Sequence, residues 1–514
     1  MILAQYTIRS KQDYIYKTNR IVEIMGASEN ISRSWDILFE QAEKCGLKIK
    51  RADNEDDFNF DNIKKAFDER TLDMVELFIG GGNDTVLFRE KGEEEEEEPY
   101  IRANRAFSYY LIKNYPGMIP MAVGQNVSGN YQNDYRNLMK KADEEKNRMV
   151  SGTDTFILPF SLMDRDTFLP MAESNNGERY SRESLSKRIV GIECRNNDKA
   201  VRLLDDMVTK RGDESLLAVV HADGNNMGSK IRLLLGNNTD YDFCVKAMRK
   251  FTADTAAAFT TNGLKAMEDC KESLIKKYKD EKKYKKADGK TKEHMFAFRK
   301  VIADGDDMTF ICNARFAMEY TQAYIKAVQN YESMQNPSWK YSSCAGMCIF
   351  HSHYSFANAY KLAEKACDDG AKSKVHKVGE NGNPIPVEEG WVDFHYIHSS
   401  VGGDLMTIRR RQGTIAKMAR PWCLTNGDME YSYERMIDLA EIFRNYNVTR
   451  TDIKALGVDW ENSNELGYKS LKRVYGHHRG LENEIKVKLK WNDEQLMRAV
   501  YDLSEIYDLW FAEV

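Results

Sequence analysis

The apolar positions of the first 130 residues alternate between the spacing of a strand and that of a helix. Residues 2–8 predict a short apolar strand, and the apolar positions over 14–25 recur at helical spacing. The segment VELFIGGGNDTVLFR then predicts two strands joined by a tight turn. A helix around 103–113 and a strand over 118–123 complete a β-α-β-β-α-β order. That order predicts an antiparallel sheet with helices on one face.

The same order recurs after residue 214. The strand LLAVVHAD ends in an acid, and a helical region over 241–278 leads to the hairpin FAFRKVIADGDDMTFICN. A helix over 317–331, a strand over 342–350, a helix over 356–371 and a strand over 391–397 follow. We therefore predict an α+β protein with two similar units in tandem, 1–149 and 215–424. Residues 150–214 form a polar connector, and residues 425–514 predict a helical C-terminal domain.

Composition narrows the class of protein without revealing its chemistry. The chain has 42% hydrophobic residues, 30% charged residues and 9 prolines among 514 residues. This composition excludes disordered, collagen-like and membrane-embedded proteins. The formal net charge of -5 excludes a generally basic nucleic-acid binder but leaves a local basic groove open. Nine scattered cysteines without a CxxC pair argue against a disulfide framework and favour a cytoplasmic location. No apolar run approaches the ~18 residues of a membrane span, so we expect no membrane association.

Two charge runs interrupt the pattern of helices and strands. Six like charges over Glu93–Glu98 predict a solvated loop. The lysine-dense segment Lys271–Lys292 predicts an exposed helical arm and loop. A nucleic-acid contact is the alternative for that arm, although its aromatic residues are limited to Tyr278 and Tyr284.

Three acids occupy positions where a β-α-β-β sheet brings chain segments together. Asp223 ends its strand, and Asp306 and Asp307 lie at the following hairpin. Three close carboxylates repel one another unless a divalent cation neutralises them, and oxygen ligands favour Mg²⁺ or Mn²⁺. This pattern predicts two-metal nucleotidyl transfer. The alternative for an isolated DGDD segment is a type I′ turn without chemistry.

Phosphate contacts are predicted on both sides of these acids. The small and amide residues after Asp223 predict a phosphate cradle, formed by Gly224, Asn225, Asn226, Met227 and Gly228. Lys372 and Lys374 follow the helix over 356–371, where they are either ordinary C-terminal helix charge or, for Lys372, a triphosphate contact. We interpret His221, His351 and His353 as core or strand-end residues, because no third residue at zinc-site spacing accompanies them.

The motifs HADGNNMG and ADGDDM, followed by AYKLAEKACDDGAKSK, resemble the palm domain of GGDEF-type nucleotide cyclases. They resemble more closely the second palm of the large polymerase/cyclase subunit of type III CRISPR effectors. The segments QDYIYKTNRIVEIMGAS and FIGGGNDTVLF are similar to the first palm of that subunit, in which the acids are lost. The resemblance covers roughly residues 1–135 and 215–425. It implies two tandem ferredoxin-like palm domains and a helical C-terminal domain.

The resemblance also implies an activity, which is the joining of ATP into cyclic oligoadenylate signals for antiviral defence. Asp223, Asp306 and Asp307 would be catalytic ligands of two Mg²⁺ or Mn²⁺ ions. Gly305 would allow close approach of the nucleotide and Lys372 would contact phosphate. The first palm, with Ser10 and Asn83 where acids would be needed, would bind a second nucleotide without catalysing, through Gly81, Gly82 and Asn83. Lys374 completes the expected nucleotide contacts.

Three departures from the family pattern modify these expectations. Asp304 replaces a glycine of the usual Gly-Gly-Asp-Asp, which adds a charge. The sequence contains no His-Asp dipeptide, so we expect no nuclease domain. The connector segment LPFSLMDRDTFLPMAESNNGERYSRESLSK resembles the family's zinc-bearing insert without its cysteines, so no zinc is expected. Together these departures suggest a stand-alone or minimal relative.

Two other functions stay open. One is a non-catalytic scaffold that senses nucleotides or RNA within a CRISPR-like ribonucleoprotein, and the other is a GTP-using dinucleotide cyclase. Because a constitutive signal would be toxic, we expect an RNA or protein activator, and a downstream effector that responds to the cyclic product. The sequence leaves the base specificity, the ring size and the oligomeric state undetermined.

Overall fold

The computed structural model describes residues 1–52, 57–148, 160–175, 177–197, 204–210, 214–285, 291–375, 377–378, 384–385, 388–398 and 403–511. The predicted domain boundary at 149–150 and the tip of the lysine-rich arm at 286–290 lie outside these residues. The chain divides into two compact units. The first consists of Met1–Lys199 and Asn226–Ala257, and the second of Ala200–Asn225 and Ala258–Val514.

The first unit is built around a mixed sheet in the order β2-β3-β4-β1-β5. Its strands, with those of a separate hairpin, are β1 (Ile2–Arg9), β2 (Ile49–Lys50), β3 (Met74–Gly80), β4 (Asn83–Phe88), β5 (Ile119–Asn126), β6 (Met171–Asn175) and β7 (Glu178–Ser181). Its helices are α1 (Lys11–Ile15), α2 (Ile21–Ser32), α3 (Ser34–Lys44), α4 (Phe60–Asp68), α5 (Pro99–Asn114), α6 (Tyr131–Arg148), α7 (Arg182–Asn197), α8 (Met227–Leu235) and α9 (Tyr241–Thr255).

Helices cover both faces of this first sheet. On β1, Tyr6 places its ring 6.0 Å from the ring of Phe107 on α5. Leu3 lies in a core cluster with Leu138 of α6 and Val245 of α9. Positions three apart on a strand face opposite sides. The expected arrangement with helices on one face is therefore wrong for this unit, because both faces of β1 carry apolar residues that must be buried.

The connector contains more regular structure than its polar composition indicates. Helix α7 packs on α2, and a Cβ atom on Gly26 or Gly191 would lie 1.8 Å from a carbonyl oxygen of the other helix. The preceding loop is organised around the buried carboxylate of Asp164, which accepts hydrogen bonds from the backbone of Ser181 (2.9 Å) and the hydroxyl of Ser184 (2.6 Å).

The second unit contains a sheet in the order β15-β14-β11-β8-β10-β9. Its central part, β11-β8-β10-β9, arises from a β-α-β-β-α-β order, so the predicted ferredoxin-like α+β fold is confirmed. The strands of this unit are β8 (Leu216–Gly224), β9 (Phe298–Asp304), β10 (Asp307–Asn313), β11 (Ser343–His351), β12 (Lys377–Val378), β13 (Pro384–Ile385), β14 (Trp391–Tyr396) and β15 (Trp422–Cys423). Its helices up to residue 411 are α10 (Gly263–Tyr278), α11 (Ala317–Gln329), α12 (Phe356–Lys365) and α13 (Leu405–Arg411).

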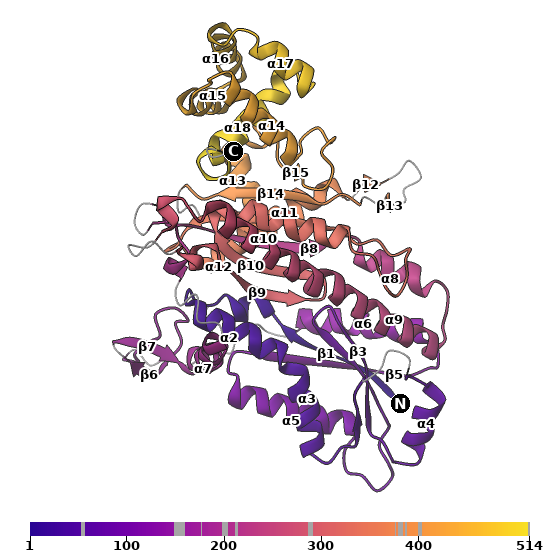
Figure 1. The fold of residues 1–514 in the computed structure, drawn as a ribbon. Coiled ribbons are helices and arrows are strands. Elements are labelled where there is room, and N and C mark those ends of the chain that lie inside the picture. The colour runs from indigo at the N-terminus through magenta and orange to yellow at the C-terminus, as the bar shows by residue number, and fades with distance from the viewer. Residues whose placement is uncertain are drawn as a thin grey trace. The chain divides into compact units, whose positions relative to one another are not determined.

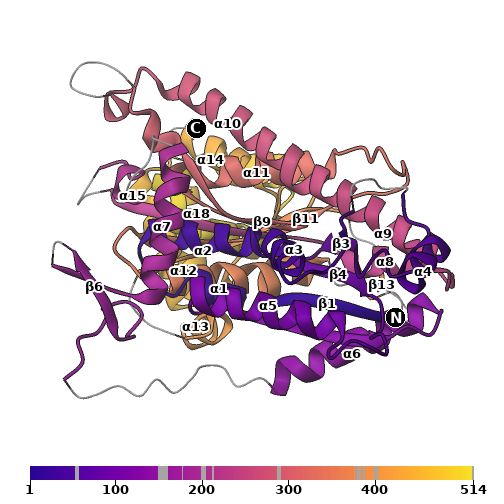
Figure 2. The same ribbon diagram turned by 90° about the horizontal axis from the view of Figure 1, so that it is seen from below.

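The second sheet is also covered on both faces. Helices α10 and α11 lie side by side over one face (Figures 1 and 2), where Tyr320 of α11 contacts Phe310, the partner of Val220 on β8. The next residue on β8, His221, faces the other side and meets Tyr360 of α12 edge to face at 5.7 Å. The expectation that helices cover only one face of the sheet is wrong for this unit too. Helix α12 is needed because β8 is buried on both faces.

The predicted C-terminal helical region is helical in the structure. It consists of α14 (Tyr433–Asn445), α15 (Arg450–Asn462), α16 (Asn464–His477), α17 (Leu481–Lys488) and α18 (Asp493–Trp510), which gather beyond β14 and β15 (Figure 1). Helix α18 joins the sheet through Asp502, which accepts from the guanidinium of Arg420 at 2.9 Å and from the indole of Trp422 at 3.1 Å.

The aromatic residues of the lysine-rich arm are not displayed for stacking. Tyr278 and Tyr284 are buried, and both contact the ring of Phe316. Base stacking on these two rings is therefore excluded in this conformation. Among the described helices, none combines the length and the apolar character that a membrane crossing requires.

Candidate functional site

The predicted acids lie at adjoining ends of two paired strands. Asp223 is near the end of β8 and Asp307 begins β10, and the neighbouring residues Ala222 and Met308 are register partners. Asp306 lies in the two-residue loop between β9 and β10. Asp223 and Asp307 have the same parity as His221 and Thr309, so their side chains belong to the face covered by α12. The convergence expected from the strand order is present.

The electrostatics of Asp306 show how closely these acids are placed. The pKa of the Asp306 carboxyl is raised to about 7, chiefly by burial and in addition by the nearby carboxylates of Asp223 and Asp307. Each of the two neighbours disfavours a second negative charge. The cluster is therefore a place where added positive charge is strongly favoured.

One positive charge at this cluster comes from Lys372. Its ammonium donates to the Asp223 carboxylate and lies 3.8 Å from Asp368. Although burial opposes the charged form, Asp223 raises the pKa of Lys372 above its usual value. Lys372 therefore remains a cation at any physiological pH. Asp368 was not predicted from the sequence; its spacing of four from Lys372 on a helical segment was the available signal.

A local distortion of the helix brings Lys372 to this position. Helix α12 continues as a π-helical segment over Ala366–Gly370 and a 3₁₀ turn over Ala371–Lys374. Below it on β11 lies Gly346, where a Cβ atom would be 1.9 Å from the Ala363 carbonyl oxygen. A Cβ atom on Gly370 would be 1.9 Å from a carboxylate oxygen of Asp393. Such π-bulges are frequent at functional sites, and these two glycines make room for this one.

His221 contacts the site, although we interpreted it from the sequence as a core or strand-end residue. Its ring is buried, with Nδ1 3.4 Å from the Asp307 carboxylate and 3.2 Å from the Thr309 hydroxyl. Burial lowers the pKa of His221, so the ring is held neutral. Its place on β8 two residues before Asp223 was the signal that could have included it.

The two hairpin loops differ in backbone geometry. Gly305 has φ 60°, whereas its neighbour Asp306 is not among the residues with positive φ. Type I′ turns need positive φ at both loop residues, so the DGDD segment is not the type I′ turn of the alternative interpretation. In the first unit, Gly81 and Gly82 have φ 57° and 67°, and Asn83 begins β4. That loop has the I′ pattern.

The remaining predicted nucleotide contacts are distributed over both units. Gly224 and Asn225 belong to the second unit, where the Asn225 amide donates to the Ser342 carbonyl at 2.9 Å. Asn226, Met227 and Gly228, at the start of α8, belong to the first unit, as do Gly81, Gly82 and Asn83. The ammonium of Lys374 lies 5.8 Å from the ring centroid of Trp391. The nucleotide roles of these residues stay predictions.

The donor chemistry of the cluster suits a hard divalent cation, but its present geometry is not closed around one. Within the described ranges, no three His, Cys, Asp or Glu side chains are grouped as a metal site. Lys372 pairs with one of the predicted ligands, Asp223. Three carboxylates and a lysine are residue types suited to binding Mg²⁺ or Mn²⁺ together with a triphosphate.

Comparison with protein-family models gives a match to one part of the chain. Residues 216–378 match the family model described as Cas10/Cmr2, second palm domain. A search of curated proteins by sequence gives no match.

Solved structures with a similar chain course belong to type III CRISPR assemblies. A crystal structure of a Csm1–Csm4 cassette in complex with pppApA matches with 12% identity over 97% of this chain and 69% of that chain, with a TM-score of 0.47. Csm1 from T. onnurineus matches with 11% identity, 97% and 69% coverage, and a TM-score of 0.44. The apo state of a type III-B Cmr-β complex matches with 10% identity, 99% and 81% coverage, and a TM-score of 0.47. The match to the family model confirms the predicted resemblance to the second palm domain of Cas10/Cmr2 over residues 216–378.

Proposed function

We propose that the second unit is a metal-dependent nucleotidyltransferase that joins ATP molecules into a cyclic oligonucleotide second messenger. The observation that carries this proposal is the convergence of Asp223, Asp306 and Asp307 with Lys372 on one face of a palm-type sheet. The family match over residues 216–378 supports the same activity. A purely structural role does not explain half-buried carboxylates that repel one another.

The residues of the cluster divide the work of binding between them. Asp306 and Asp307 would hold the divalent ions together with Asp223, and His221 would keep the Asp307 carboxylate oriented from behind. Lys372 would leave Asp223 and pair with a triphosphate oxygen. The exchange is possible because the carboxylate and the triphosphate are both anionic and the ammonium stays charged. Bound Mg²⁺ or Mn²⁺ would acidify the attacking 3′-hydroxyl and neutralise the triphosphate.

The reaction balances without any further co-reactant. A bond forms between the 3′-oxygen of one nucleotide and the α-phosphorus of another. The bond from that phosphorus to pyrophosphate breaks, and the hydroxyl proton passes to solvent. The chain supplies alignment and charge, which is most of what phosphoryl chemistry requires from a protein.

The proposal is tested by pyrophosphate release from each labelled NTP with Mg²⁺ or Mn²⁺. The isolated chain and the assembly purified from its native cells are assayed in parallel, since we expect an RNA or protein activator. Mass spectrometry of the product gives its base, linkage and ring size, and a GTP product would move the assignment to the dinucleotide-cyclase alternative. Nucleotide binding without pyrophosphate release in both preparations would establish the scaffold instead. Turnover that survives Asp306→Ala with Asp307→Ala would overturn the assignment of the reaction to this cluster.

A further inference from the structure

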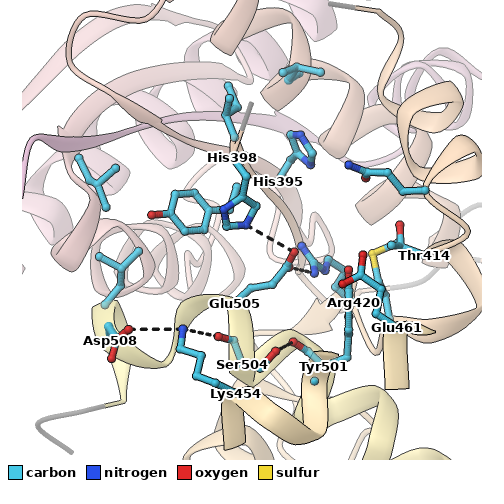
Figure 3. Close-up of a pocket in the computed structure, with 18 of the residues that line it drawn as sticks. His395, His398, Thr414, Arg420, Lys454, Glu461, Tyr501, Ser504, Glu505 and Asp508 are labelled. Carbon is cyan, nitrogen blue, oxygen red and sulfur yellow. Dashed lines mark hydrogen bonds and ion pairs between the residues drawn. The ribbon is translucent and has the colours of Figure 1, made fainter. Parts of the chain in front are cut away.

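A cavity of about 540 Å³ lies in the second unit, away from the aspartate cluster. It is bordered by the end of β14, by α13, and by α15 and α18 of the helical region (Figure 3). Leu216, at the start of β8, lines it, whereas Asp223 lies seven residues further along that strand. At ~3.3 Å per residue the two places are roughly 23 Å apart along β8. The volume is in the range of small-molecule sites.

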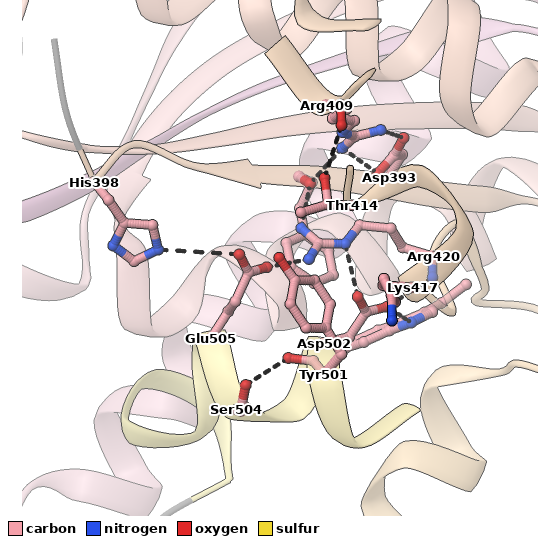
Figure 4. A network of polar contacts seen from close by, with 12 residues as sticks. Asp393, His398, Arg409, Thr414, Lys417, Arg420, Tyr501, Asp502, Ser504 and Glu505 are labelled. Carbon is pink, nitrogen blue, oxygen red and sulfur yellow. Dashed lines mark hydrogen bonds and ion pairs between the residues drawn. The ribbon is translucent and has the colours of Figure 1, made fainter. Parts of the chain in front are cut away.

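The basic side chains of this cavity already have carboxylate partners. Among the described lining residues the basic ones are Arg315, Arg409, Arg420 and Lys454. Arg409 donates twice to the fully buried Asp393, at 2.6 and 2.9 Å, and Arg420 donates to Asp502 at 2.9 Å (Figure 4). Arg315 lies 3.2 Å from Glu214, and Lys454 lies 3.3 Å from Asp508. An anionic ligand would have to displace these carboxylates, so the cavity disfavours anions.

One negative charge remains after this pairing, because Asp508 also pairs with Arg450 and six carboxylates then face five cations. The carboxylates that line the cavity are Glu214, Glu461, Glu505 and Asp508, and Asp393 and Asp502 lie behind the arginines. Glu505 extends between Arg420 and His398, whose Nε2 is 4.0 Å away (Figure 3). Glu461 on α15 is exposed and forms no ion pair with the described residues. These two carboxylates can accept hydrogen bonds from a positively charged guest.

Aromatic rings complete the lining. Tyr354, Tyr396 and Tyr501 border the cavity, and the ring of Tyr396 lies 4.3 Å from that of His398. The imidazole of His395 is uncharged, because burial and the nearby Arg409 and Arg420 lower its pKa to about 3. The electron-rich faces of tyrosine rings attract ammonium and guanidinium groups. The tyrosine rings and the carboxylates together favour a ligand that carries an ammonium or guanidinium group.

We propose that this cavity binds a small organic cation that carries an ammonium or guanidinium group, with Glu505 and Glu461 as acceptors and the tyrosine rings as its walls. The site is independent of the proposed nucleotidyl transfer, so failure of either proposal leaves the other standing.

The experiment is calorimetric titration of the full chain with agmatine and with spermidine. We expect saturable binding of one molecule per chain by at least one of these probes. The variant Val458→Lys places a tethered ammonium at the exposed cavity lining, where Val458 is 57% exposed, and should weaken binding about tenfold or more. The matched control is Val487→Lys on α17, which adds the same charge at a 66% exposed valine outside the lining and should leave binding unchanged.

A second pair of variants tests the acceptors. Glu505→Gln and Glu461→Gln should each weaken binding, by about tenfold and about threefold respectively, because Glu505 is the more buried. Glu465→Gln, an exposed glutamate on α16, is the control. The proposal is overturned if neither probe binds at concentrations up to about 10 mM, at which even a weak specific site would be occupied. It is also overturned if Val458→Lys and Val487→Lys bind the probe equally. Tighter binding of inorganic phosphate by Val458→Lys than by wild type would also overturn the choice of a cation. Circular dichroism confirms that every variant is folded.

Discussion

The ammonium of Lys372 donates to the carboxylate of Asp223, a residue 149 positions earlier in the chain. Both side chains are largely buried, with 15% and 29% of their surfaces exposed. The pair joins the end of β8 to the distorted end of α12, and it places one cation on a cluster of several acids. A divalent ion that binds at Asp223 must compete with this lysine.

Replacing Lys372 by methionine should therefore change metal and nucleotide affinity in opposite directions. Without the competing ammonium, Mn²⁺ should bind the nucleotide-free protein about three to ten times more tightly. ATP affinity in the presence of metal should fall about tenfold or more, because a charge-assisted phosphate contact is lost. Mn²⁺ titration followed by electron paramagnetic resonance, and ATP binding by calorimetry, measure the two effects. Loss of both affinities together would mean that Lys372 only supports the fold.

The variant Asp306→Asn should stabilise the metal-free protein while it abolishes activity. Removing one of three mutually repelling acids relieves repulsion, and the free energy of unfolding should rise by about 1 kcal/mol or more in EDTA at pH 8. The raised pKa of about 7 means that the folded state holds this proton more tightly than the unfolded state. Wild-type stability from this group is therefore full below about pH 4 and falls as the pH rises to about 7. The advantage of the variant should be largest above pH 7.

Asp269→Asn, at an exposed position of α10, is the control for this experiment. It should change neither stability nor pyrophosphate release. Asp306→Asn should lower pyrophosphate release about 100-fold or more. A variant that is less stable than wild type at every pH would show that Asp306 forms a favourable structural contact, and would contradict our interpretation of the cluster.

Gly346→Ala tests whether the π-bulge of α12 depends on close approach to β11. The added Cβ atom would lie 1.9 Å from the Ala363 carbonyl oxygen and 2.2 Å from the Cys367 amide nitrogen, so backbone must move. We expect a loss of about 3 kcal/mol in the free energy of unfolding, measured by urea denaturation. Gly476→Ala in α16 has open space around its Cβ position and should instead gain about 0.5–1 kcal/mol. Equal effects of the two substitutions would exclude the steric explanation.

The sequence predicted the parts of the fold that rest on local pattern. The strand ending at Asp223 and the hairpin at Gly305 follow from apolar runs and turn residues, and the structure has both. Whether helices cover one sheet face or two was not readable, because a strand buried on both faces, such as β8, shows only a continuous apolar run.

The candidate site was predictable where chemistry is encoded by residue type, and unpredictable where it depends on contact between distant segments. The sequence alone identifies three acids at predicted strand ends, Asp223, Asp306 and Asp307. The neutral state of His221 depends on burial under Tyr360, and the cavity beside β14 is formed by residues as distant in sequence as Leu216 and Asp508. Neither relation leaves a periodic or motif signal in one chain.

The imidazole of His395 should make the second unit sensitive to mild acid. Burial, followed by the charges of Arg409, Arg420 and His398, lowers its pKa from 6.5 to about 3. Between these two values the unfolded chain takes up a proton that the folded chain excludes, so stability falls as the pH drops from about 6.5 toward 3. At pH 5 this one group should cost about 2 kcal/mol relative to pH 8. Urea denaturation of wild type and His395→Gln at both pH values measures the difference, and we expect the variant to lose about 2 kcal/mol less than wild type on acidification. His353→Gln, an exposed histidine, should acidify like wild type. Parallel pH profiles for wild type and His395→Gln would show that the ring is solvated and free to protonate.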